Sequence, residues 1–115
     1  MAKTYALVTG WVLIILGVLG FFMNPLLGLS FLPTMPVHNG IHLVSGIWGA
    51  WAGSSSERAA AVFSKLFGVI YTLVALIGFF GGAGLLASLG VEITPLYNVI
   101  HLVVGLGGLW AGFGV

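Results

Sequence analysis

The hydrophobic positions form four long, nearly uninterrupted segments, which are separated by short stretches rich in polar residues, proline and glycine. The apolar segments run from Tyr5 to Met23, from Pro36 to Gly53, from Val62 to Gly81 and from Pro95 to Phe113. Each holds roughly 17–20 residues, the length of helix that crosses a hydrocarbon core of about 30 Å. Apolar residues do not alternate with polar ones as in barrel strands, so we expect helices. The pattern predicts an all-α, integral membrane four-helix bundle forming a single domain over residues 1–115.

The composition excludes several classes of protein and of functional site. Only 4% of the 115 residues are charged, 60% are hydrophobic and the mean hydropathy is +1.22, whereas an average soluble domain is about a quarter charged. Three basic residues are too few for a nucleic-acid surface. The chain has no Cys, which excludes disulfides and thiolate ligands. It also has no Asp, so it cannot form a Ser-His-Asp triad. Glu57 and Glu92 are expected on opposite sides of the membrane, so they cannot form a catalytic carboxylate pair. We therefore expect that the protein is not an enzyme.

The basic residues predict the orientation. With four crossings, Lys3 falls on the same side of the membrane as the polar link from Ser54 to Arg58 and the nearby Lys65. Loops rich in Lys and Arg stay in the cytoplasm, so both termini are expected inside.

The second half of the chain repeats the first. Residues 36–53 and 95–112, aligned at an offset of 59, are identical at 11 of 18 positions. The first and third segments align at an offset of 58, through Gly10/Gly68, Gly20/Gly78, Phe21/Phe79 and Phe22/Phe80. We expect two tandem helical hairpins, repeat 1 over residues 5–53 and repeat 2 over residues 62–113. An even number of crossings per copy makes this a parallel repeat, with a pseudo-twofold axis along the membrane normal.

One face of the second and fourth segments carries the shared polar and small residues. These are Asn39, His42, Gly46, Gly49 and Gly53 in the first copy, and Asn98, His101, Gly105, Gly108 and Gly112 in the second. Each set falls within roughly 80° of the helix circumference. Polar groups avoid lipid and glycines let helices approach closely, so this face is expected inside the bundle. Trp48 and Trp51 lie off it and are expected to face lipid or a partner.

The doubled motif Asn-x-x-His-x-x-x-Gly, beginning at Asn39 and at Asn98, carries a resemblance. Together with the Gly-Phe-Phe that ends the first and third segments, it resembles a bacterial four-helix membrane family catalogued as domain of unknown function 4383. The resemblance covers essentially the whole chain. It implies the fold and a location in a bacterial inner membrane or an internal photosynthetic membrane. It implies no activity, because that family has none assigned.

The candidate site consists of Asn39, His42, Asn98 and His101, the one constellation that could carry chemistry. In a structural interpretation, these side chains form interhelical polar contacts worth about 0.6–2 kcal/mol each and fix the pairing of the hairpins. In a cofactor interpretation, the two histidines lie at equal depth and could ligate a b-type haem from both sides. A chlorophyll-type pigment would need only one of them.

Two further interpretations are weaker. Histidine titrates near neutral pH, which suits proton or small-solute transport, but no charged residue continues a path to the inner side. A zinc site would need a third ligand, and the repeat replaces His38 with Tyr97; we expect His38 at headgroup level. We therefore expect a non-enzymatic structural or accessory subunit that associates with lipid and with other membrane subunits or itself. A tetrapyrrole-binding protein is the alternative.

Overall fold

The computed structural model describes residues 1–23, 28, 35–91 and 93–114, and every helix in that part longer than a single residue is an α-helix. The helices are α1 (Ala2–Phe22), α2 (Pro36–Ser55), α3 (Glu57–Phe79), α4 (Ala83–Ser88) and α5 (Pro95–Phe113). The predicted all-α class is confirmed. By length and composition, α1, α3 and α5 could each cross a membrane, which is consistent with a membrane protein.

The second expected span lies in α2, which has 20 residues but is not among the three helices that meet this criterion. Its first two turns hold His38, Asn39 and His42. These polar side chains lower its hydropathy, since its length matches that of its neighbours. The same residues make up part of the candidate site.

The links between helices differ from those expected. The predicted polar link from Ser54 to Arg58 shrinks to one residue, because α2 continues to Ser55 and α3 begins at Glu57. The Ser56 hydroxyl caps α3 by accepting a hydrogen bond from the Ala59 N–H at 3.0 Å, as Ser favours at this position. The stretch before α5 contains the short helix α4, which the sequence pattern did not predict. Glu92 lies outside the described residues.

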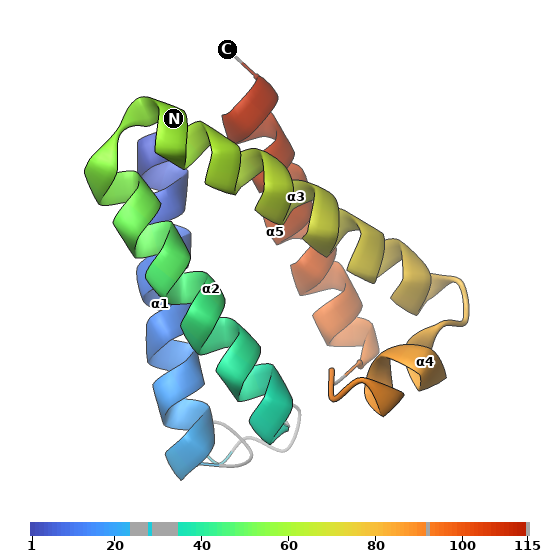
Figure 1. Ribbon diagram of the computed structural model, residues 1–115. Coiled ribbons are helices and arrows are strands. Elements are labelled where there is room, and N and C mark those ends of the chain that lie inside the picture. Colours follow the sequence, from blue (N-terminus) through green and yellow to red (C-terminus); the bar gives the residue numbers. More distant parts are fainter. Residues whose placement is uncertain (24–27, 29–34, 92, 115) are drawn as a thin grey trace.

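The four long helices pair as two hairpins (Figure 1). Helix α1 packs along α2, and α3 packs along α5, in the two most extensive helix contacts. The hairpins meet through α2 and α3 and through α1 and α3, with a smaller contact between α1 and α5. Both chain ends lie at the same end of the molecule as the α2–α3 turn (Figure 1).

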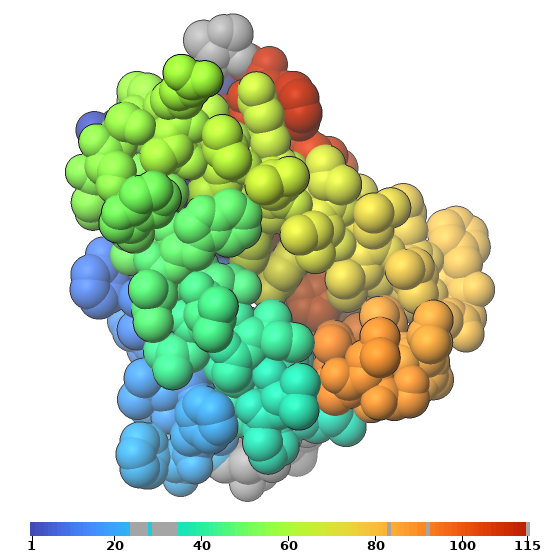
Figure 2. Space-filling model, viewed as in Figure 1, coloured from blue at the N-terminus to red at the C-terminus, as the bar shows by residue number. Residues whose placement is uncertain are grey.

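At the opposite end, the contact between the hairpins is extended by the segment that follows helix α4. The turn after it contains Gly90 with φ +86°, a backbone conformation that glycine adopts without strain. A Cβ on Gly90 would lie 2.6 Å from the Cβ of Val37 in α2. Figure 2 shows α4, in orange, beside the first part of α2, in teal.

Glycines set the close approach of the helices within each hairpin. A Cβ on Gly10 of α1 would lie 2.8 Å from the Gly46 carbonyl oxygen in α2. A Cβ on Gly68 of α3 would lie 2.8 Å from the Gly105 carbonyl oxygen in α5. Backbone atoms cannot yield as a side chain can, so neither position accepts a larger residue without moving the helices apart.

An aromatic cluster fills the contact between α2 and α3. The Phe63 ring is fully buried, at 0% exposure. It meets Trp48 edge-on at 4.8 Å and stacks on Phe67 at 5.0 Å, and Phe67 in turn stacks on Tyr71 at 4.1 Å. These separations suit attractive ring pairs. The expectation that Trp48 faces lipid or a partner is wrong, because it packs on the other hairpin; Trp51 is exposed as expected.

Candidate functional site

The helices that carry the candidate residues begin alike. Pro36 and Pro95 occupy the first positions of α2 and α5, where proline's missing N–H would have no partner within the helix. At α5 the Thr94 hydroxyl also accepts a hydrogen bond from the Tyr97 N–H at 3.1 Å. His42 and His101 each follow their proline by six residues, so each lies about 9 Å along its helix.

Three imidazole rings from two helices meet between the hairpins. His38 and His42 lie one turn apart on α2, with ring centroids separated by 4.3 Å. The His101 ring of α5 lies 6.0 Å from the His38 ring. No Cα pair within the described parts of α2 and α5 comes within 8 Å. Long polar side chains, rather than close backbones, therefore join these two helices.

Two tyrosines complete the ring cluster. Tyr71 of α3 meets His101 edge-on, with centroids 5.3 Å apart. Tyr97 of α5 lies 6.3 Å from His101 and 6.5 Å from His38. The five rings come from α2, α3 and α5 and form a compact contact between the two hairpins. Below, "ring cluster" means these five residues.

The sequence interpretation missed most of this cluster. His38, expected at headgroup level, is only 5% exposed and packs against both other histidines. Its position four residues before His42 was the available signal, because residues i and i+4 share a helix face. Tyr97 occupies the position that aligns with His38 in the second copy. Nothing in the local pattern around Tyr71 pointed to its contact with His101.

The asparagines lie in a different environment from the histidines. Asn39 packs its side chain against Gly20 of α1, and Asn98 packs its side chain against Gly78 of α3. Both contacts lie inside a hairpin, whereas the ring contacts of His38 with His101 and Tyr97 join the two hairpins. Of the four predicted residues, His101 meets a ring of the other hairpin, whereas His42 packs on His38 of its own helix.

The six predicted packing glycines lie at helix contacts. A Cβ on any of them would come within 3.0 Å of a facing helix. The facing residues are Gly10 and Ile14 for Gly46, Phe63 and Gly10 for Gly49, Leu7 for Gly53, Thr72 for Gly105, Ser64, Gly68 and Tyr5 for Gly108, and Lys65 for Gly112. Gly49 and Gly108 are each approached by a ring of the opposite hairpin, Phe63 and Tyr5 respectively.

Several buried polar atoms near the cluster make no hydrogen bond with the described residues. They are the Nδ1 atoms of His42 and His101, the Oγ1 of Thr72 and the Oδ1 of Asn98. A buried group of this kind costs about 1–3 kcal/mol relative to one that is hydrogen-bonded. For the two histidines, the contacts that hold the imidazoles in place are ring contacts rather than bonds from these nitrogens.

The arrangement does not fit a tetrapyrrole held between His42 and His101. Such a group needs an open slot between its two ligands, wide enough for a flat macrocycle. Here the His38 ring contacts both of the other histidine rings. No three His, Asp or Glu side chains within the described ranges are placed to hold a metal ion. The cluster as arranged is a packed contact between helices.

Comparison of the chain with known protein families, with curated proteins and with solved structures finds no match.

Proposed function

We propose that this chain is a four-pass membrane protein made of two tandem copies of a helical hairpin, α1–α2 and α3–α5. The resemblance to the family catalogued as domain of unknown function 4383 belongs to the same proposal. The proposal of two tandem copies is supported by the helix contacts, which match between the two hairpins. Gly10 meets Gly46 as Gly68 meets Gly105, and Gly20 meets Asn39 as Gly78 meets Asn98. Each residue in the second set aligns with its counterpart in the first, at offsets of 58 and 59.

We further propose that the protein acts as a non-enzymatic structural or accessory subunit of a membrane assembly. The observation that carries this proposal is the distribution of polar and apolar side chains. The histidines and asparagines are turned into helix contacts, while Trp11, Trp51 and Trp110 are each more than half exposed. An apolar exterior with short links offers its helix faces to lipid or to other membrane-spanning helices.

The proposed orientation places Lys3, Arg58 and Lys65 in the cytoplasm. All three lie at the end of the molecule that holds the α2–α3 turn and the described chain ends (Figure 1). Lys65 extends along α5 and holds its ammonium group 4.9 Å from the centre of the Phe113 ring. The ring cluster then lies in the outer half of the bilayer.

The tetrapyrrole alternative finds less support, because His38 packs against both proposed ligands. We instead propose that the ring cluster joins the two hairpins. It lies between them, at a place where the backbones of α2 and α5 do not come close to each other. In this role the histidines hold α2 near α5 through ring packing, and no bound group is needed.

The test is to delete the gene in the native host and to separate its solubilised membrane complexes by size in mild detergent. We expect one larger membrane complex to lose mass or stability and to recover when the chain is restored. Recovery of every larger complex unchanged, with the chain itself isolated only as a free monomer, would contradict the proposed role.

A further inference from the structure

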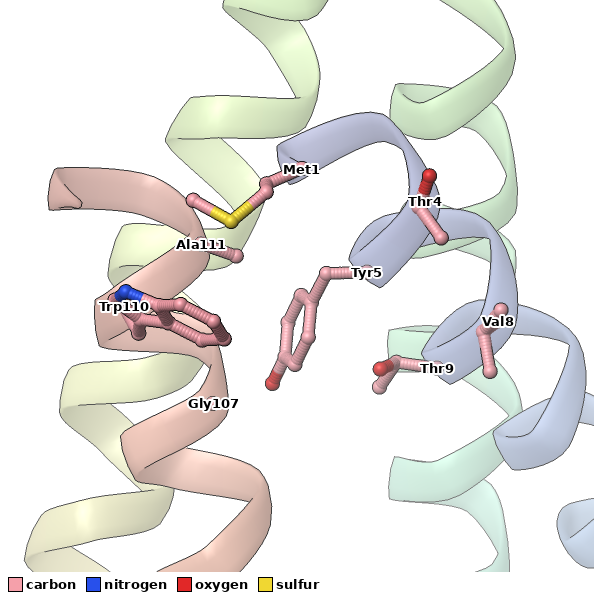
Figure 3. A pocket seen from close by; sticks show the side chains of 8 residues that line it. All are labelled: Met1, Thr4, Tyr5, Val8, Thr9, Gly107, Trp110 and Ala111. Carbon is pink, nitrogen blue, oxygen red and sulfur yellow. The ribbon is translucent and has the colours of Figure 1, made fainter. Parts of the chain in front are cut away.

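A groove runs between α1 and α5, at the end of the molecule opposite the ring cluster. It has a volume of about 540 Å³ and is lined by Met1, Thr4, Tyr5, Val8, Thr9, Gly107, Trp110 and Ala111. Figure 3 shows the Tyr5 ring projecting into the space between the helices, with Trp110 across from it. The Tyr5 hydroxyl donates a hydrogen bond to the Val104 carbonyl oxygen at 2.7 Å, so the polar end of this side chain is satisfied.

The contact between α2 and α3 aligns in the sequence with the contact between α1 and α5. Comparing the two shows which side chains the groove lacks. Gly107 aligns with Trp48, Tyr5 with Phe63, and Thr9 with Phe67. Between α2 and α3, those three aromatic rings pack together and close the contact. Between α1 and α5, a glycine and a threonine replace two of the three rings. The groove therefore occupies the positions that the rings of Trp48 and Phe67 fill in the contact between α2 and α3.

We propose that a membrane-spanning helix of another subunit fills this groove with a bulky apolar or aromatic side chain, in the position that Trp48 takes in the aligned contact. This inference rests on the proposed accessory role and identifies the surface that performs it. Gly107 and Ala111 let a second helix backbone come close. Trp110, which is 69% exposed at the edge of the groove, is the residue type most enriched where binding energy concentrates.

A helix fits the groove better than an acyl chain does. Thr4 lies in the lining, and a neighbouring helix can hydrogen-bond to its hydroxyl whereas a hydrocarbon tail cannot. The precedent within this molecule is also a helix, since the ring that closes the aligned contact belongs to α2. Lipid in the groove and a second copy of the chain are thus competing outcomes that an experiment must separate.

Gly107 provides a direct way to fill the groove. Among the residues that the structure describes, a Cβ at this position would meet only the Tyr5 ring, at an ordinary distance of 3.5 Å, so the fold accepts a side chain there. Gly107→Trp places an indole where the partner's side chain is proposed to insert. Gly40→Trp is the matched control, because a Cβ on Gly40 meets no described residue within 4 Å and Gly40 does not line the groove.

The experiment combines these variants with photo-crosslinking in native membranes. A benzophenone amino acid replaces Val8, an exposed residue of the groove lining, or Leu66, its exposed counterpart on α3. Crosslinked peptides are then sequenced by mass spectrometry. We expect Val8 to crosslink to a large apolar or aromatic residue in a membrane-spanning segment of another subunit, and Leu66 not to. Gly107→Trp should lower recovery of that subunit at least about tenfold, while Gly40→Trp leaves it unchanged.

Other results overturn the inference in distinguishable ways. Crosslinking of Val8 only to phospholipid, or only to a second copy of this chain, excludes the proposed occupant. Equal recovery of a partner subunit by wild type and Gly107→Trp contradicts the groove but leaves the accessory role standing. If the wild-type chain brings down no membrane subunit at all, the accessory role fails and the inference fails with it.

Discussion

Two contacts between the hairpins occupy aligned positions in the sequence but are packed differently. In the filled seam, between α2 and α3, Trp48, Phe63 and Phe67 form a continuous aromatic cluster. In the open seam, between α1 and α5, Gly107, Tyr5 and Thr9 take those places and leave a groove. The glycine contacts inside the two hairpins match closely by comparison. The difference shows that helices can pair alike within the two hairpins while the contacts between the hairpins are packed differently, one closed by aromatic rings and the other open.

The largest expected effect comes from the contacts inside the hairpins. Gly68→Leu adds a side chain where a Cβ would already lie 2.6 Å from the Leu109 backbone nitrogen. Because backbone cannot give way, we expect α3 and α5 to separate, with loss of a monodisperse species in size-exclusion chromatography in detergent. Gly107→Leu, in the open seam, should leave the elution profile unchanged. Equal disruption by both variants would show that any added bulk on these helices is harmful.

The next effect distinguishes the two seams. Phe63→Ala removes a fully buried ring with two aromatic neighbours in its own seam, and should lower the free energy of unfolding by about 3–5 kcal/mol. Tyr5→Ala, its counterpart beside the groove, should cost less, since part of that ring is already unpacked. Unfolding in a denaturing detergent titration gives both values. Equal losses would remove the distinction between a filled and an open seam.

The ring cluster gives a third prediction, which concerns the nature of its contacts. His101→Phe keeps a ring of similar size and removes both ring nitrogens, of which the buried Nδ1 has no hydrogen-bond partner among the described residues. Stability should change by less than about 1 kcal/mol, because no hydrogen bond from Nδ1 is lost. His101→Ala removes the ring contacts with His38 and Tyr71 and should cost about 2–4 kcal/mol. A large loss in His101→Phe would instead show that the imidazole itself is required, as for a bound ligand or a polar bond.

The smallest expected effect is a gain. Thr9→Phe places in the open seam the residue found at the aligned position of the filled seam. Partial filling of the groove should raise the free energy of unfolding of the isolated chain by about 0.5–2 kcal/mol. Thr4→Phe, on the exposed edge of the same lining, is the control and should raise it less. A loss of stability in Thr9→Phe would mean that the groove is too narrow for the ring.

The sequence predicted the helices well, because long apolar runs and prolines at helix starts depend on local physics. Pro36 and Pro95 begin α2 and α5 as expected. Two details of the links were missed. Ser54 and Ser55 continue α2 by two residues beyond Gly53, and they donate their hydroxyls to the carbonyls of Ala50 and Trp51. Helix α4 is too short for an amphipathic pattern to indicate it.

The candidate site was predicted only in part, because its geometry depends on how the hairpins meet. Periodicity placed His42 and His101 on the inward face of their helices, but it could not show that His38 would lie against both. The same limit explains Trp48, which was expected to face lipid or a partner and instead packs on Phe63. Offsets in the repeat identify equivalent positions within each hairpin. They do not reveal that Gly107, opposite Trp48 in the alignment, leaves one seam open.

The accessory role is tested most directly by native mass spectrometry of the tagged chain, purified from its own membranes in mild detergent. An absorption spectrum is recorded on the same sample. We expect the chain in a fixed stoichiometry with at least one different membrane subunit, and an absorption spectrum that shows only the 280 nm band of Trp and Tyr. A free monomer carrying a visible absorption band, which disappears when His42 and His101 are replaced by Phe, would contradict the account and establish a pigment-binding protein instead.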